Sequence, residues 1–75
     1  MDKVLFIRRM EEALRASPAS IHEADALESL EGWDSIGALS MMAMIDEHYG
    51  MTLEARELVS CATVAGLIRF VEKGR

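Results

Sequence analysis

The sequence GWDSIGALSMMAMIDEHYG at residues 32–50 decides the fold of this chain. Asp34 is a favourable helix cap, because its carboxylate can accept the unpaired N–H groups of a first turn. Gly50 supplies the left-handed conformation that ends many helices. A helix is therefore predicted to begin at Asp34-Ser35 and to end at Gly50. Its inward stripe is predicted to be Ala38, Leu39, Met42, Ile45 and Tyr49, and its other side Gly37, Ser40, Met44, Glu47 and His48.

Three further helices are predicted around this one. The first covers residues 2–15 and stops before Pro18, because the residue before a proline is pushed out of the α region. A brief third helix covers residues 54 to 59 or 60. Thr63 is predicted to cap the last helix, which Gly74 stops. The apolar residues that recur at helical spacing on the first and last helices are Phe6, Ile7, Met10, Ala13, Leu14, Val64, Leu67, Ile68 and Val71.

A long connection at residues 19–33 joins the first two helices. A loop of this length in so small a domain must be tied down or functional. One helical turn is expected near residues 26–30, and the expected anchors onto the core are Ile21, Leu27, Leu30 and Trp33. The fold class is therefore all-α: a four-helix bundle with three longer helices, a short third helix and a long first loop, formed by residues 1–75 as a single domain.

The size and composition of the chain narrow the function classes. Seventy-five residues allow one modest core and leave little room for a deep catalytic pocket. One cysteine excludes an internal disulfide framework, and no apolar run approaches the roughly 20 residues that span a bilayer. We expect a cytoplasmic, monomeric protein that does not insert into membranes.

Charge is unevenly placed along the sequence. Between Arg15 and Arg56 there is no Lys or Arg, and the interval holds eight acidic residues. Such a segment repels phosphate backbones and attracts proteins with basic surfaces, so a nucleic-acid partner is not expected. The acidic residues of this interval are Glu23, Asp25, Glu28, Glu31, Asp34, Asp46, Glu47 and Glu54.

Ser35 is the candidate chemical site. The sequence places its hydroxyl at the first turn of a helix, where unpaired N–H groups and the positive end of the dipole favour an attached phosphate. Neither histidine is near in sequence, so no local base is available to make Ser35 a nucleophile of its own. His22 and His48 lack partners at metal-ligand spacing and are expected to face solvent without binding a metal. Cys61 is expected to be a buried, unreactive thiol.

The chain resembles the acyl carrier proteins and related phosphopantetheine-binding domains over nearly its whole length. The attachment motif of that family is Asp-Ser-Leu, and here it reads Asp34-Ser35-Ile36. The other residues in register are Leu27, Leu30, Leu39, Met42, Ile45, Tyr49, Leu53, Thr63, Val64, Leu67, Ile68 and Val71. The resemblance implies that a phosphopantetheinyl transferase moves a 4'-phosphopantetheine arm from coenzyme A onto Ser35, and that the thiol of the arm holds acyl cargo as a thioester.

The resemblance also implies that the second helix and the loop before it dock on partner enzymes with basic surfaces. These would be a loading ligase and downstream biosynthetic enzymes. The candidate docking residues are Glu31, Trp33, Gly37, Ser40, Met44 and Glu47. Trp33 is expected mainly to anchor the end of the loop. The second helix has fewer acids than carriers of fatty acid synthesis usually show, which favours a specialised pathway.

Three alternatives stay open from the sequence. The arm on Ser35 could carry aminoacyl or peptidyl cargo, because the Gly32-to-Ser35 segment is compatible with both carrier types. The chain could also be a carrier-like module that docks without being modified. A small hydrolase is the least favoured. If the cargo is apolar, the core is expected to open between the second and last helices and admit it beside Met42, Ile45, Leu67 and Ile68.

Overall fold

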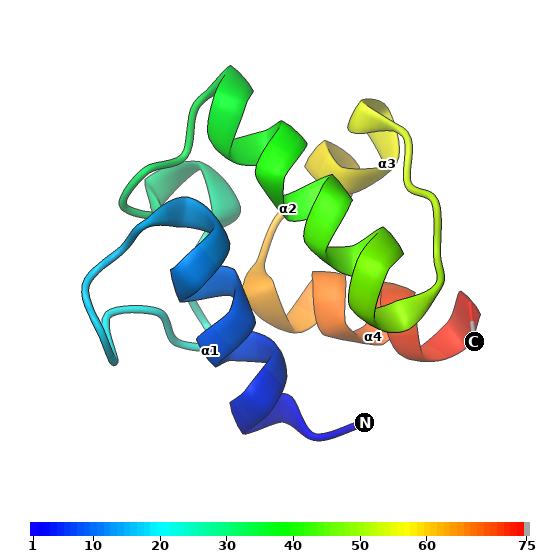
Figure 1. Ribbon diagram of the computed structural model, residues 1–75, viewed down its shortest axis with the longest axis horizontal. Helices are drawn as coiled ribbons and strands as arrows, with labels where there is room; N and C mark the ends of the chain where they lie inside the picture. The colour runs from blue at the N-terminus through cyan, green and yellow to red at the C-terminus, as the bar shows by residue number, and fades with distance from the viewer. Residues whose placement is uncertain (75) are drawn as a thin grey trace.

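The computed structural model describes residues 1–74 and contains four α-helices within that range (Figure 1). They are α1 (Lys3–Leu14), α2 (Ser35–Tyr49), α3 (Ala55–Ser60) and α4 (Val64–Gly74). The loop between α1 and α2 includes one 3-10 turn, η1 (Leu27–Ser29). The all-α bundle with a short third helix is therefore confirmed, and the predicted helix ends agree with the observed ones to within two residues.

The predicted caps form as side-chain hydrogen bonds. The backbone N–H of Gly66 donates to Thr63 Oγ1 at 3.0 Å and starts α4. Asp2 was not predicted to be a cap, but its Oδ1 accepts the N–H of Leu5 at 3.1 Å at the start of α1. These bonds satisfy donors that a first helical turn otherwise leaves unpaired, so they fix where each helix begins.

The core lies where α1, α2 and α4 meet, and the long loop and α3 close it (Figure 1). The loop anchors Ile21, Leu27 and Leu30 are buried as predicted, and Trp33 is half-buried against the same cluster. The largest completely buried side chains are Phe6, Met10, Met41, Ile45, Leu58, Val64, Leu67, Ile68 and Val71.

The predicted inward stripe of α2 was partly wrong. Leu39 was expected in the core but is 62% exposed, whereas Met44 was expected outside and is only 7% exposed. The buried face consists of Gly37, Met41, Met44 and Ile45. Apolar and small residues surround most of this helix, so helical spacing alone does not single out one face. Contact with α1 on one side and with α3 on another decides it.

The end of α1 packs tightly against the start of α2. Gly32 has φ +81°, and a Cβ atom there would collide with the carbonyl oxygen of Leu14. A Cβ on Gly37 would collide with the carbonyl oxygen of Gly32 and approach Leu14 Cδ2 to 3.0 Å. Two glycines therefore let the backbone before and inside α2 approach Leu14 more closely than any side chain would permit.

Backbone hydrogen bonds hold the long loop onto the start of α4. The N–H of Leu27 donates to the carbonyl of Ala62 at 2.9 Å, and the N–H of Val64 donates to the carbonyl of Asp25 at 3.0 Å. Earlier in the loop, the N–H of Ile21 donates to Glu11 Oε2 at 3.1 Å, and this glutamate is 8% exposed. The loop is thus fixed to α1 at one point and to α4 at another.

Replacing Gly32 with alanine is expected to lower the free energy of unfolding by about 2–5 kcal/mol. The left-handed backbone costs an L residue about 1–2 kcal/mol, and crowding against Leu14 adds about 1–3 kcal/mol. Gly50 is the matched control, because it has φ +65° but nothing within 4 Å of an added Cβ. Urea unfolding of Gly32→Ala and Gly50→Ala measures the difference in the free energy of unfolding. Equal losses of stability in the two variants would contradict the close contact between Gly32 and Leu14.

Candidate functional site

Ser35 is the first residue of α2 and is exposed to solvent. Asp34 precedes it in an extended conformation, and its Oδ1 accepts the N–H of Gly37 at 2.7 Å. The carboxylate is thereby turned toward the helix axis and caps the helix. The serine hydroxyl is not needed for capping and is exposed. Figure 1 shows that the first turn of α2 lies at one end of the molecule, where the loop joins it.

The first turn of α2 suits an anionic group on this hydroxyl. Among residues 1–74, the N–H groups of Ser35 and Ile36 have no hydrogen-bond acceptor, whereas that of Gly37 is taken by Asp34. Unpaired N–H groups at a helix start carry partial positive charge and favour phosphate. The nearby carboxylate of Asp34 works against this preference, so the turn accommodates a phosphodiester without forming a strong anion site by itself.

Large apolar side chains are exposed just after Ser35. Ile36 is 75% exposed and Leu39, one turn further along, is 62% exposed. Val59 on the neighbouring α3 is 66% exposed. The sequence analysis placed Leu39 in the core and therefore did not identify it as a surface residue. Its exposure gives the start of α2 an apolar surface beside the acidic loop.

The structure separates the candidate docking residues into two groups. Glu31 and Glu47 are exposed, and Ser40 is half-buried at the surface of α2. Gly37 and Met44 are buried, so the prediction that they contact partners was wrong. Gly37 is buried by its contact with Leu14, and Met44 lies in the core because α2 presents a different face to α1. Trp33 packs against the core, as expected of an anchor.

A polar groove of about 500 Å³ between α1 and α2 brings basic residues beside Glu47. Arg9 and Arg15 come from α1 and its C-cap, and His48 comes from α2. No Lys or Arg is near Glu47 in sequence, and the sequence analysis therefore treated it as part of an acidic segment. The pairing of helices that creates this groove could not be inferred from spacing along one helix.

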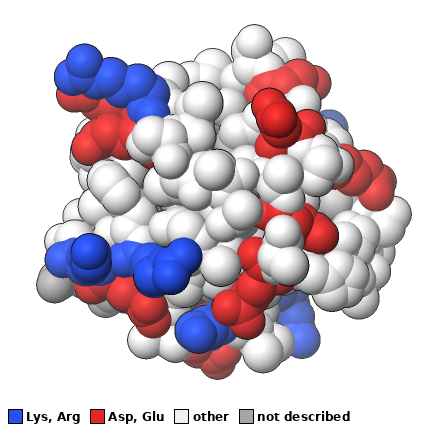
Figure 2. Space-filling model, turned by 180° about the vertical axis from the view of Figure 1, so that it is seen from behind, with Lys and Arg blue, Asp and Glu red and all other residues white. Residues whose placement is uncertain are grey.

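Of the acidic residues in the long loop, Glu23 lies 3.8 Å from Lys3 Nζ, whereas Glu28 and Glu31 form no ion pair among residues 1–74. Figure 2 shows the back of the molecule, with Asp and Glu side chains spread over the half that holds the loop. The Lys and Arg side chains in this view lie mainly at the opposite and lower margins. Glu31 belongs to this loop, and its Oε1 accepts the hydroxyl of Ser17 at 3.3 Å. Negative charge therefore concentrates on the loop before Ser35 more than along α2.

The remaining titratable candidates do not form a second site. Cys61 is half-buried, its Sγ donates to the carbonyl of Glu57 at 3.3 Å, and burial raises the pKa of its thiol, with the Glu57 charge adding to the effect. A raised pKa keeps the thiol protonated and weakens it as a nucleophile. His22 and His48 are exposed, as predicted. Among residues 1–74, no group of three or more His, Cys, Asp or Glu could hold a metal ion.

The family model for the phosphopantetheine attachment site matches residues 5–71. The chain therefore belongs to the phosphopantetheine-binding carrier domains, which bind 4'-phosphopantetheine covalently and carry cargo without acting as catalysts. No curated protein and no solved structure is similar enough to count as a match. Within residues 1–74, each helix is too short or too polar to cross a membrane.

Replacing Asp34 with alanine is expected to lower the free energy of unfolding by about 1 kcal/mol, because the N–H of Gly37 loses its acceptor. Asp34→Ser keeps a capping oxygen, so its free energy of unfolding should fall by only a few tenths of the loss expected for Asp34→Ala. Urea unfolding followed by circular dichroism compares the two variants with the parent chain. A loss as large for serine as for alanine would show that charge, and not capping, is the contribution of Asp34.

Proposed function

We propose that residues 1–75 form a single carrier domain that holds acyl cargo on a 4'-phosphopantetheine arm attached to Ser35. The observation that carries this proposal is the exposed Ser35 hydroxyl at the first turn of α2, with the cap supplied by Asp34. Asp34 and Ile36 flank it as the Asp-Ser-Leu motif of the family does. A structural serine at this position would be redundant, since the helix is already capped.

Attachment needs chemistry from a partner enzyme. The Ser35 oxygen bonds to the phosphorus that carries the pantetheine arm in coenzyme A, and the bond from that phosphorus to the nucleotide phosphate breaks. The hydroxyl proton passes to a base of the transferase, and 3',5'-ADP leaves. The described part of the carrier supports this division of labour, because both histidines lie elsewhere and Cys61 is held protonated. The carrier contributes an accessible hydroxyl in a fixed position.

Acyl cargo in a specialised pathway is favoured by the surface of α2. Carriers that meet many enzymes of fatty acid synthesis usually present a strongly acidic second helix. Here Asp46 and Glu47 are the acids of α2 itself, and Ile36 and Leu39 are exposed near its start. The proposed partners are a phosphopantetheinyl transferase, an acyl-loading ligase and downstream enzymes, met by a monomer in the cytoplasm. Their docking surfaces would join an apolar patch to basic residues.

Electrostatic recruitment is proposed to depend on the loop more than on the far end of α2. Glu31 lies four residues before Ser35, within the acidic loop. Glu47 lines the same groove as Arg9 and Arg15, whose positive charge offsets its field at the surface. A basic partner would therefore be attracted mainly to the end of the domain that carries the arm.

Ser35→Ala is expected to abolish attachment of the arm and to leave the fold nearly unchanged, since an exposed serine contributes little to packing. The measurement is intact mass after incubation with coenzyme A and a transferase. Ser60→Ala, which removes an exposed serine of α3, is the control and should still be modified. Modification of the Ser35→Ala chain at another residue would refute the assigned site, and an unmodified parent chain would favour the docking-only module.

The modified chain then distinguishes the cargo classes. Offered acyl and aminoacyl ligases side by side, it is expected to be loaded by the acyl enzymes. Loading by aminoacyl ligases alone would replace the acyl proposal with an aminoacyl carrier that uses the same arm.

Glu31→Lys is expected to slow arm attachment more than Glu47→Lys, because only Glu31 lacks compensating bases beside it. Initial rates at several salt concentrations provide the measurement, and added salt should slow the parent chain, since exposed charges are screened over about 8–10 Å. Glu72→Lys on α4 is the charge-matched control and should be nearly neutral. Rates that do not depend on salt, or equal effects of the three reversals, would refute recruitment by the loop.

A further inference from the structure

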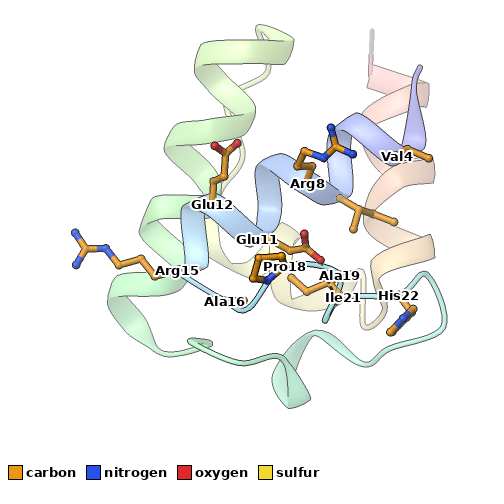
Figure 3. Close-up of a pocket in the computed structure, with 11 residues that line it drawn as sticks. Val4, Arg8, Glu11, Glu12, Arg15, Ala16, Pro18, Ala19, Ile21 and His22 are labelled. Carbon is orange, nitrogen blue, oxygen red and sulfur yellow. Dashed lines mark hydrogen bonds between the residues drawn. The ribbon is translucent and has the colours of Figure 1, made fainter.

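A groove of about 730 Å³ runs along α1 beneath the first part of the long loop (Figure 3). Its volume is within the range that holds small ligands. The apolar residues that line it are Val4, Ile7, Ala16, Pro18, Ala19 and Ile21. It lies on the side of the bundle formed by α1 and the loop, whereas the sequence predicted a cargo site between α2 and α4.

Charged residues border the groove without filling it. In Figure 3, Glu12 and Arg15 extend away from the loop segment that carries Pro18 and Ile21. Glu11 points toward the loop, and its Oε2 is occupied by the N–H of Ile21 at 3.1 Å. This bond joins α1 to the loop, and the groove beside it is present without prior opening of the core.

One end of the groove adjoins the segment that leads to Ser35. Arg15 and Ala16 line this end, and Leu14 before them contacts Gly32 and Gly37. From Arg15 to Val4 the groove follows about three turns of α1, which is roughly 16 Å at 1.5 Å per residue. The groove therefore begins near the attachment turn and runs away from it.

The loop wall is joined directly to the approach to α2. The Ser17 hydroxyl donates to Glu31 Oε1 at 3.3 Å, and Glu31 lies four residues before Ser35. A chain attached at Ser35 would pass this contact before it meets the apolar part of the groove.

We propose that an acyl chain carried by the arm lies in this groove between α1 and residues 16–21. The inference rests on the proposed attachment at Ser35. Apolar cargo is stabilised in proportion to the number of methylene groups removed from water. The core route beside Ile45, Leu67 and Ile68 would first require separating side chains that are at most 1% exposed. The groove offers apolar contact without that cost.

Acyl cargo is the occupant that matches the lining. An aminoacyl group has too little apolar surface to cover Val4 and Ile7, and its ammonium group would lose water beside them. The cargo chain therefore contributes to recognition by its length, with longer chains covering more of α1 toward Val4.

Isoleucine methyl groups give a direct test, because the five isoleucines of the chain lie at different candidate positions of the cargo: the groove, the core and the attachment turn. NMR spectra of isoleucine-labelled protein are compared between acetyl-loaded and octanoyl-loaded forms. Ile7 and Ile21 should shift with chain length, while Ile45 and Ile68 should not. Ile36 reports attachment in both forms. Shifts at Ile45 and Ile68 would show that the cargo enters an opened core. Identical spectra of the two loaded forms at Ile7, Ile21, Ile45 and Ile68 would show that the cargo stays in solvent. Either result would contradict the proposal that cargo binds in the groove.

Two matched valines test the same surface by stability. Val4 lines the groove and is 67% exposed, whereas Val59 on α3 is 66% exposed and lies outside it. Octanoyl loading should raise the melting temperature of the parent chain over the acetyl form. Val4→Asp should reduce this increase and Val59→Asp should preserve it. Equal increases in both variants would overturn the groove.

Failure of the groove can be distinguished from failure of the attachment site. Free octanoyl-pantetheine is titrated into the Ser35→Ala chain, which carries no arm under the proposed function. Shifts at Ile7 and Ile21 are expected there too, at higher ligand concentration. If the parent chain gains no arm but these methyls shift, the attachment proposal fails and the groove stands. If the arm attaches and these methyls stay fixed in every form, the groove alone is overturned.

Discussion

The close contact of Leu14 with Gly32 and Gly37 is the constraint on which the rest of the molecule depends. It joins the last turn of α1 to the residues just before and just inside α2, so it sets the position of the first turn that presents Ser35. It also determines which side of α2 is buried, because Gly37 must face α1. Met41, Met44 and Ile45 follow on the same side, and Leu39 is left in solvent. One backbone approach thus controls both the core and the exposed surface.

The distribution of charge over the folded surface differs from its distribution along the sequence. The interval without basic residues suggested one acidic surface, but α1 places Arg9 and Arg15 beside Glu47. In the loop, Lys3 of α1 pairs with Glu23 at 3.8 Å, but among residues 1–74 Glu28 and Glu31 form no ion pair, so the part of the loop nearer Ser35 keeps its negative field. Recognition would therefore begin at the end of the domain where the arm is attached, and the apolar side chains of Ile36 and Leu39 lie at that end.

Local signals in the sequence were sufficient for much of this fold. Caps, helix stops and the apolar spacing of α1 and α4 are effects of neighbouring residues, so Asp34, Thr63 and Gly50 could be interpreted directly. The face of α2 could not, since its apolar residues surround the helix and a choice among them depends on the partner helices. The two grooves were also missed, because each is formed by segments that are brought together only by folding.

The loop before α2 has a path that its backbone determines. Carbonyl and N–H groups of Asp25 and Leu27 pair with residues at the start of α4, and apart from Asp25, whose Oδ2 also accepts the N–H of His22 at 2.8 Å, the exposed side chains of this stretch leave those bonds to the backbone. Substitutions other than proline at such surface positions can therefore change charge, size or polarity while the main chain keeps its course. The backbone of this loop therefore keeps one conformation while its exposed side chains can be substituted. Partner preference can then differ between relatives of this carrier without changes in the helices of the core.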